Sequence, residues 1–130
     1  MGPVLFKSAL IAAGVTAAYH TGRRFRRFAI SGNSMVPSLL PGDWVLVDEQ
    51  TYRRRLPHRG DIVVARDPRD PTRTIVKRVS SIDLHGGIRI EGDNPEESTD
   101  SREFGPVPAA NLQGRVRWRY WPLGRVGSVT

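Results

Sequence analysis

Ile62-Val63-Val64-Ala65 and Thr74-Ile75-Val76-Lys77-Arg78-Val79 are two short runs rich in β-branched residues, and they decide the fold. Two Asp-Pro pairs, at residues 67–68 and 70–71, stand between them. β-branched side chains favour strands, whereas Asp and Pro favour turns. We therefore expect a β-hairpin whose loop covers Asp67 to Thr74 and whose second strand carries Lys77.

Similar short runs lie on both sides of this hairpin. Each is rich in β-branched or aromatic residues, and turn signals containing Gly separate the runs. The runs are Trp44–Val47, Ile88–Ile90 and Val116–Trp121, and the turn signals are Pro41-Gly42-Asp43, Arg59-Gly60-Asp61 and His85-Gly86-Gly87. Strands at this spacing, with no helical segments between them, predict a mainly β fold: an antiparallel, strongly bent sheet or a partly open β-barrel.

Length and charge narrow the class of protein. The chain has 130 residues, enough for one domain, which we place at residues 29–130. The net charge is +7, and basic chains attract phosphate groups. No helix-turn-helix or other nucleic-acid module is legible, so we do not expect nucleic-acid binding. The chain contains no Cys, which excludes disulfides and thiolate chemistry.

The first 28 residues differ from the rest. Residues 3–19 are mostly apolar and predict a short N-terminal helix, at the lower length limit for spanning a bilayer. An interfacial anchor and a cleaved secretory signal are the alternatives. The basic run Arg23–Arg27 follows, and we read residues 1–28 as an anchor and linker that contribute no strand. We expect membrane association through both segments. Because Arg clusters tend to stay cytoplasmic, the side of the membrane remains open, and a cytoplasmic location is the alternative.

The choice of cations points to chemistry. The chain has eighteen Arg and two Lys, Lys7 and Lys77. Arg stays charged at any working pH, whereas a buried Lys can lose its proton and act as a base. A candidate nucleophile, Ser34, stands upstream in the run Ser31–Leu39, with the sequence SGNSMVPSL. Together, Ser34 and Lys77 suggest a serine–lysine hydrolase.

Several segments, in the same order, resemble the signal peptidase I family, which uses a Ser-Lys dyad. The resemblance covers about residues 29–121, and the short layout is similar to that of the inner-membrane peptidases of mitochondria. Only 14 residues separate Lys77 from Gly92, which implies a minimal catalytic core without an inserted β domain. The segments that carry the resemblance are Ser31–Leu39, Pro41–Val47, Arg59–Val64, Val76–Val79, Gly92–Asn94, Asp100–Arg102 and Gly105–Pro108.

The resemblance implies a role for each matched residue. Ser34 is the expected nucleophile and Lys77 its general base. The Ser98 hydroxyl would hold the lysine amine, and an Asp100–Arg102 ion pair would shape the loop. Met35 would be an apolar neighbour of the nucleophile, and Asp93 and Asn94 would form a tight turn behind the site. For the oxyanion we expect the Ser34 backbone N–H as donor, since Gly32 stands where some relatives have a hydroxyl, with Ser31 one residue further back.

These roles predict a serine endopeptidase that removes N-terminal signal or leader peptides from a precursor polypeptide. We expect no cofactor and no metal, because neither the three His nor the acids of residues 91–100 have a metal-ligand spacing. The alternative is a cytosolic maturation protease for a single precursor, such as that of nickel superoxide dismutase. A self-cleaving repressor-type regulator would need a DNA-binding domain, for which residues 1–28 are too short. A basic, non-enzymatic membrane-binding module is the last alternative.

Overall fold

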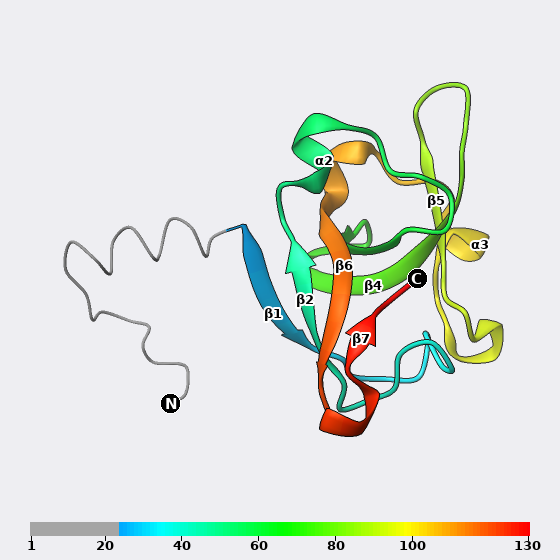
Figure 1. Cartoon of the computed structure of the whole chain (residues 1–130). Helices are drawn as coiled ribbons and strands as arrows, with labels where there is room; N and C mark the ends of the chain where they lie inside the picture. Colours follow the sequence, from blue (N-terminus) through cyan, green and yellow to red (C-terminus); the bar gives the residue numbers. More distant parts are fainter. Residues whose placement is uncertain (1–23) are drawn as a thin grey trace.

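Residues 24–130 are described by a computed structural model, shown in Figure 1. Within them, seven antiparallel strands form one sheet in the order β1-β2-β6-β3-β4-β5, and β7 pairs with β6. The strands are β1 (Phe25–Ala29), β2 (Trp44–Asp48), β3 (Ile62–Asp67), β4 (Asp70–Ile82), β5 (Ile88–Glu91), β6 (Leu112–Trp121) and β7 (Gly127–Ser128). Short helical turns connect them: α2 (Thr51–Arg54), η1 (Pro95–Glu97), α3 (Ser101–Phe104), η2 (Ala109–Asn111) and η3 (Leu123–Arg125).

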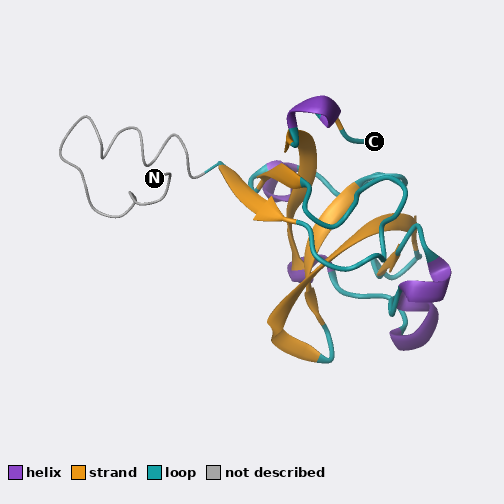
Figure 2. Ribbon diagram, turned by 90° about the horizontal axis from the view of Figure 1, so that it is seen from below, coloured by secondary structure: helices purple, strands orange, loops and turns teal. Residues whose placement is uncertain are grey.

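The sheet is strongly bent. Register shifts interrupt the β2–β6, β3–β4, β3–β6 and β4–β5 pairs. Each shift places an extra residue in one strand, which raises the local twist and bends that strand. The strands consequently curve around one another, with the helical turns at the periphery (Figure 2). The predicted mainly β, antiparallel and unclosed fold is confirmed.

Strand β3 lies at the centre and is buried on both faces. Its side chains alternate between two apolar clusters: Ile62 and Val64 belong to the first, and Val63 and Ala65 to the second. A strand with a core on each side needs a continuous apolar run, which is what the quoted stretch provides. The first cluster also holds Met35 and Leu39.

Strand β4 places Lys77 inside the second cluster. Ile75, Lys77 and Val79 alternate with less buried residues and therefore share one face. Ile75 and Val79 pack in the second cluster with Ile88 and Ile90 of β5. In the β3–β4 ladder, Lys77 lies opposite Val63. Lys77 therefore shares its face of β4 with apolar side chains.

The predicted hairpin loop over residues 67–74 is wrong in length. Arg66 pairs with Thr74, and Asp67 pairs with Asp70, so the turn is tight and β4 begins at Asp70. The buried Asp67 carboxylate closes the turn by accepting hydrogen bonds from the Arg69 backbone and guanidinium. Exposed polar residues carry little strand propensity, and here backbone pairing decides their conformation.

The expectation that residues 1–28 contribute no strand is also wrong. Phe25–Ala29 form β1, which pairs with β2 along its whole length. The arginines obscured this strand in the sequence, but an edge strand can direct charged side chains to water. Phe28 packs against the first apolar cluster, and Arg24 forms an ion pair with Asp48. The sheet therefore starts before residue 29.

The predicted N-terminal helix at residues 3–19 lies outside the described residues. Among residues 24–130, no helix has the length and apolar character needed to cross a bilayer.

Candidate active site

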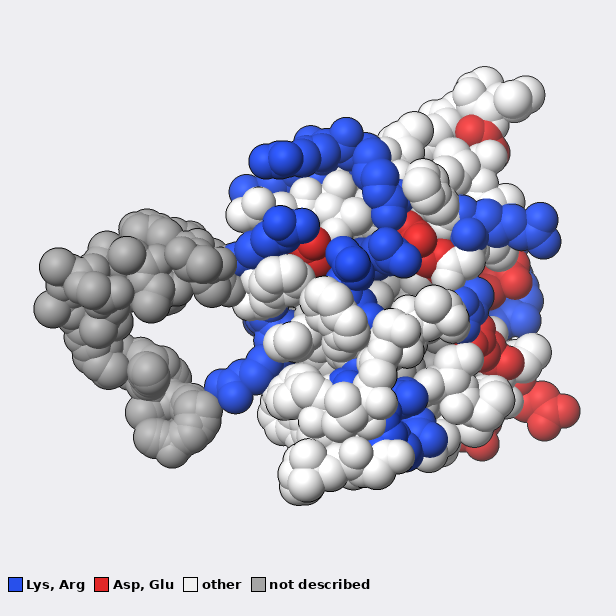
Figure 3. Space-filling model, in the orientation of Figure 1, with Lys and Arg blue, Asp and Glu red and all other residues white. Residues whose placement is uncertain are grey.

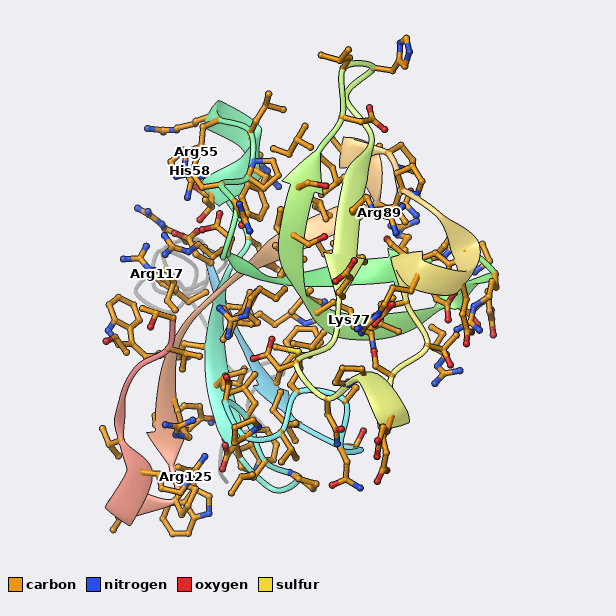
Figure 4. The ribbon with its side chains drawn as sticks, turned by 90° about the vertical axis from the view of Figure 1, so that its right-hand side faces the viewer. Arg55, His58, Lys77, Arg89, Arg117 and Arg125 are labelled. Carbon is orange, nitrogen blue, oxygen red and sulfur yellow. The ribbon has the colours of Figure 1, made fainter. Side chains whose placement is uncertain are left out.

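The amine of Lys77 is buried and held at a defined point. Lys77 is 5% exposed, and its Nζ donates a hydrogen bond to the Ser98 hydroxyl at 3.0 Å. Burial lowers the pKa of this amine, and the nearby Asp100 carboxylate opposes that shift. Figure 4 shows Lys77 on β4, beside the segment that follows β5. The site thus favours a neutral lysine more than water does.

A short hydrogen-bond chain runs from Lys77 into the loop. The Ser98 hydroxyl accepts from Lys77 and donates to Asp100 Oδ2 at 2.5 Å. Arg102 binds both oxygens of Asp100, at 2.6 and 3.0 Å. The Gly92 N–H also donates to the Asp100 carboxylate, at 2.8 Å. The structure therefore contains the ion pair expected between Asp100 and Arg102.

Asp100 stays ionised despite complete burial of its side chain. Burial alone would raise the pKa of Asp100, but hydrogen bonds from Arg102, the Ser98 hydroxyl and the Gly92 N–H outweigh it and hold the pKa below the usual range. With its proton acceptor fixed in this way, the Ser98 hydroxyl must donate to Asp100 and can only accept from Lys77. The direction of each hydrogen bond in the chain is therefore set.

The loop that carries Ser34 lies against the same segment. The Asn94 N–H donates to the Ser34 carbonyl at 2.9 Å, and the Asn94 side chain donates to the Asn33 carbonyl at 3.1 Å. The Asn33 amide reaches Glu97 at 3.3 Å. Met35, buried in the first apolar cluster, anchors this loop to the core. Asn94 thus connects the loop that carries Ser34 to the loop that carries Ser98.

Gly92 is the point at which the two loops are in closest contact. A Cβ at this position would lie 2.6 Å from the Ser34 carbonyl oxygen and still closer to the Ser98 hydroxyl. Both distances are shorter than any real carbon–oxygen contact, so only a glycine fits between them. The Ser34 carbonyl and the Ser98 hydroxyl consequently both lie close to the position that a Cβ of residue 92 would occupy.

A second network at the site was missed in the sequence. Arg78 binds both oxygens of Asp93, at 2.9 and 2.8 Å, and the Ser38 hydroxyl donates to Asp93 at 2.6 Å. Arg78 also donates to the Gly60 carbonyl at 2.9 Å. Since Arg78 follows Lys77 directly, strand alternation sends its side chain to the opposite face, and this was the signal available in the sequence. Through Ser38, the network fixes the far end of the loop that carries Ser34.

The structure brings Lys77, Ser98, Asp100 and Arg102 together, and it brings the Ser34 loop against them. Within residues 24–130, no hydrogen bond joins the Ser34 hydroxyl to the Lys77 amine. Catalytic hydrogen bonds are often long in the absence of substrate. Ser31 and Gly32 are exposed at the start of the loop, and Gly32 has a φ of +80°. No three acidic or His side chains of the described part gather in a way that could hold a metal ion.

Comparison with known proteins identifies the family. The family described as signal peptidase, peptidase S26, matches residues 4–83 and 85–121, which is most of the chain. The chain belongs to the signal peptidase family, peptidase S26. Membership in this family makes it a serine-type endopeptidase.

Similar members of the S26 family act in mitochondria, according to their names. The mitochondrial ATP-independent inner membrane protease subunit 1b of Arabidopsis thaliana is 34% identical over 147 aligned positions, covering 95% of this chain and 87% of the relative. The mitochondrial inner membrane protease subunit 1 of Xenopus tropicalis is 36% identical, covering 76% and 71%. The human protein of the same name is 34% identical, covering 75% and 70%. This signal peptidase is thus similar to mitochondrial members, as its short layout implied.

Proposed function

We propose that this protein removes N-terminal signal or leader peptides with Ser34 as nucleophile and Lys77 as general base. The observation that carries the proposal is the buried Lys77 amine, whose pKa is lowered by burial and which the Ser98 hydroxyl orients. Burial of a cation in an apolar cluster costs folding free energy, so its presence there points to a function. The adjoining Ser34 loop supplies the hydroxyl on which such a base can act.

The reaction follows from these positions. Lys77 accepts the proton of the Ser34 hydroxyl as its oxygen attacks the scissile carbonyl carbon, and backbone N–H groups stabilise the oxyanion. The carbon–nitrogen bond then breaks, and the leaving amine takes the proton from Lys77. A water molecule, deprotonated by Lys77, then attacks the acyl ester on Ser34; the ester carbon–oxygen bond breaks, and Lys77 returns the proton to the Ser34 oxygen. Ser98 holds the amine throughout, and Asp100 and Arg102 hold Ser98.

The substrate class is a precursor polypeptide at a membrane. The similar mitochondrial proteins are named inner membrane proteases, which supports membrane association of this chain. We propose that residues 3–19 and Arg23–Arg27 provide it. An extended peptide would bind by adding a strand beside Ser34, with small residues such as Ala before the cut.

Purified variants test the dyad on a soluble peptide that spans a signal-peptide cleavage site. Ser34→Ala and Lys77→Ala should each lower kcat/KM by about a thousandfold or more. Lys77→Arg should be equally inactive, because Arg keeps its proton at working pH. Ser81→Ala, an exposed serine on β4, is the matched control and should cleave normally. Near-normal turnover by Lys77→Arg would exclude Lys77 as the base.

The pH profile is an independent check. Because Lys77 must be neutral to act, kcat/KM should rise with pH and level off once the amine has lost its proton. Burial lowers the pKa of this amine, so the plateau should begin below the ordinary range of lysine. A rate that stays constant from weakly acidic to alkaline pH would contradict a lysine base.

A further inference from the structure

A pocket of about 290 Å³ lies between the start of β1, α2 and β6. Its lining contains five arginines and a single carboxylate: Arg24, Arg54, Arg55, Arg115, Arg117 and Asp48. Figure 3 shows basic side chains gathered over α2 and the adjacent part of β6. Figure 4 places Arg55 and Arg117 on the side of the molecule away from Lys77. The pocket is therefore separate from the candidate active site.

Three separate elements direct their arginines into this space. Arg115 and Arg117 are two residues apart on β6, so both project from one face of the strand. Arg54 ends α2 and Arg55 follows it. Arg24 stands just before β1. Residues distant in sequence converge here, which an exposed run of consecutive arginines would not achieve.

Two neighbouring carboxylates, Asp48 and Asp61, neutralise the five arginines only in part. Asp48 is already bound by two nitrogens of Arg24, at 3.1 and 2.9 Å, and is 3.8 Å from Arg117. Asp61, beside the pocket, accepts its short hydrogen bonds from the Tyr52 hydroxyl at 2.8 Å and the His58 N–H at 3.0 Å. The positive charge in the lining thus exceeds the negative charge that faces it.

Two arginines retain unused donors. The Nε of Arg115 is buried without a hydrogen-bond partner among the described residues, and it is 3.5 Å from Asp61. Arg55, by contrast, already donates to the same carboxylate at 3.4 Å and to the Leu56 carbonyl at 2.8 Å. Arg54 is exposed and forms no ion pair within residues 24–130. A buried N–H without a partner costs free energy that a bound acceptor would recover.

We propose that this pocket binds the phosphate group of a phosphate ester. Guanidinium groups converge on phosphate in bidentate pairs, which combine charge with two parallel hydrogen bonds. The volume is at the lower end of the range for ligand pockets, which suits one phosphate group better than a large ligand. The phosphate belongs either to a lipid headgroup or to a small soluble ester, and both present the same chemistry to the five arginines.

The test compares two double variants of the full-length protein that have equal net charge. Arg54→Gln combined with Arg115→Gln removes two guanidinium groups from the pocket. Arg59→Gln with Arg66→Gln removes two exposed arginines elsewhere and is the matched control. Arg54→Gln alone is the second pocket variant, since its side chain is exposed and its loss cannot unfold the protein.

Two readouts distinguish the sources of phosphate. The first is the rise in Tm with inorganic phosphate or glycerol phosphate, against sodium chloride of matched ionic strength. The second is co-sedimentation with phosphatidylcholine vesicles with and without phosphatidylglycerol. We expect the pocket double variant to bind at least about tenfold more weakly than wild type, and the control to bind like wild type.

Each outcome bears on the proposal. A stabilising effect of soluble phosphate that the pocket variants lose supports the pocket and assigns it to small esters. A selective loss of binding to anionic vesicles supports it with a lipid source. Equal behaviour of the pocket and control variants, or no binding in either assay, overturns it. Binding of a DNA duplex to wild type but not to the pocket variants, without any response to phosphate, would assign the arginines to nucleic acid and also overturn the proposal.

Discussion

Lys77 is the residue at which stability and the proposed catalytic role oppose each other. Its ammonium would be better solvated in water than in the apolar cluster around β4, and burial accordingly lowers its pKa. The fold tolerates this cost at Lys77, and the Ser98 hydroxyl holds the amine through one hydrogen bond. A neutral amine next to a serine loop is what proton transfer from an alcohol requires.

Lys77→Met should therefore raise the free energy of unfolding near neutral pH while abolishing cleavage. A Lys whose folded pKa is lowered destabilises the native state below that pKa. The penalty is relieved as pH rises from the folded pKa toward the unfolded value of 10.5. The advantage of the Met variant should consequently shrink over this window. Denaturant unfolding across pH measures it, with Ser34→Ala as an inactive control that keeps the wild-type profile.

Ser98 and Ser101 allow the role of the orienting hydroxyl to be separated from ordinary packing. Ser98→Ala removes the acceptor for Lys77 and should lower kcat by roughly tenfold or more, with KM little changed. Ser101→Ala leaves the buried Ile90 N–H without its acceptor and should cost about 1–3 kcal/mol of stability without lowering kcat. Steady-state kinetics and thermal unfolding compare them. Equal kcat values in the two variants would rule out an orienting role for Ser98.

At the scale of elements, the site depends on two loops that contact each other across Gly92. One follows β1 and carries Ser34, and the other follows β5 and carries Ser98. Neither loop has regular secondary structure over most of its length, so their hydrogen bonds to one another fix the separation of the reacting groups. The Asn94 contacts and the Arg78–Asp93–Ser38 network perform this task.

Gly92→Ala should damage the enzyme more than its size suggests. The new methyl group would overlap the Ser34 carbonyl and the Ser98 hydroxyl, so at least one loop must move. Overpacking of this kind costs about 1–3 kcal/mol, and a shift near 1 Å at the reacting groups can cost about a hundredfold in rate. Gly124→Ala, where a Cβ meets nothing within 4 Å, is the control. Wild-type kcat in Gly92→Ala would contradict this account of the loop contact.

At the scale of the whole molecule, the N-terminal region has two separable parts. Strand β1 belongs to the sheet, since Phe25–Ala29 pair with β2 and Phe28 packs on the core. Residues 3–19 are proposed to place the enzyme at a membrane. The boundary between these parts lies before Arg24, whose guanidinium binds the buried Asp48.

Two truncations of different length test this division. Removal of residues 1–20 should leave folding and cleavage of a short peptide intact but lower activity on a membrane-bound precursor, because the anchor concentrates enzyme and substrate on one surface. Removal of residues 1–28 should lower Tm and peptide cleavage together, since β2 then loses β1, one of its two partner strands. Thermal unfolding and peptide assays on both proteins measure this. Equal stability of the two truncated proteins would show that β1 is dispensable.

The amino-acid sequence by itself determined the strand-rich fold and indicated the residues of the candidate active site. The runs Ile62–Ala65 and Thr74–Val79, rich in β-branched residues, predict two strands of a hairpin, and Lys77 lies in the second with apolar residues on both sides of it in the sequence. These are local patterns, because they depend only on whether each side chain faces solvent or the core. The matched segments likewise indicated Ser34, Lys77 and Ser98, together with the Asp100–Arg102 pair.

Apart from the Asp100–Arg102 pair, only the tertiary structure decided which charged residues meet. Strand β1 was hidden behind its arginines, and the Arg78–Asp93–Ser38 network and the arginine pocket each join segments distant in sequence. Ion pairs and pockets depend on how the bent sheet brings separate strands together, and hydrophobic periodicity carries no information on that. The need for Gly at position 92 has the same origin, because the two loops that exclude a Cβ come from opposite halves of the chain.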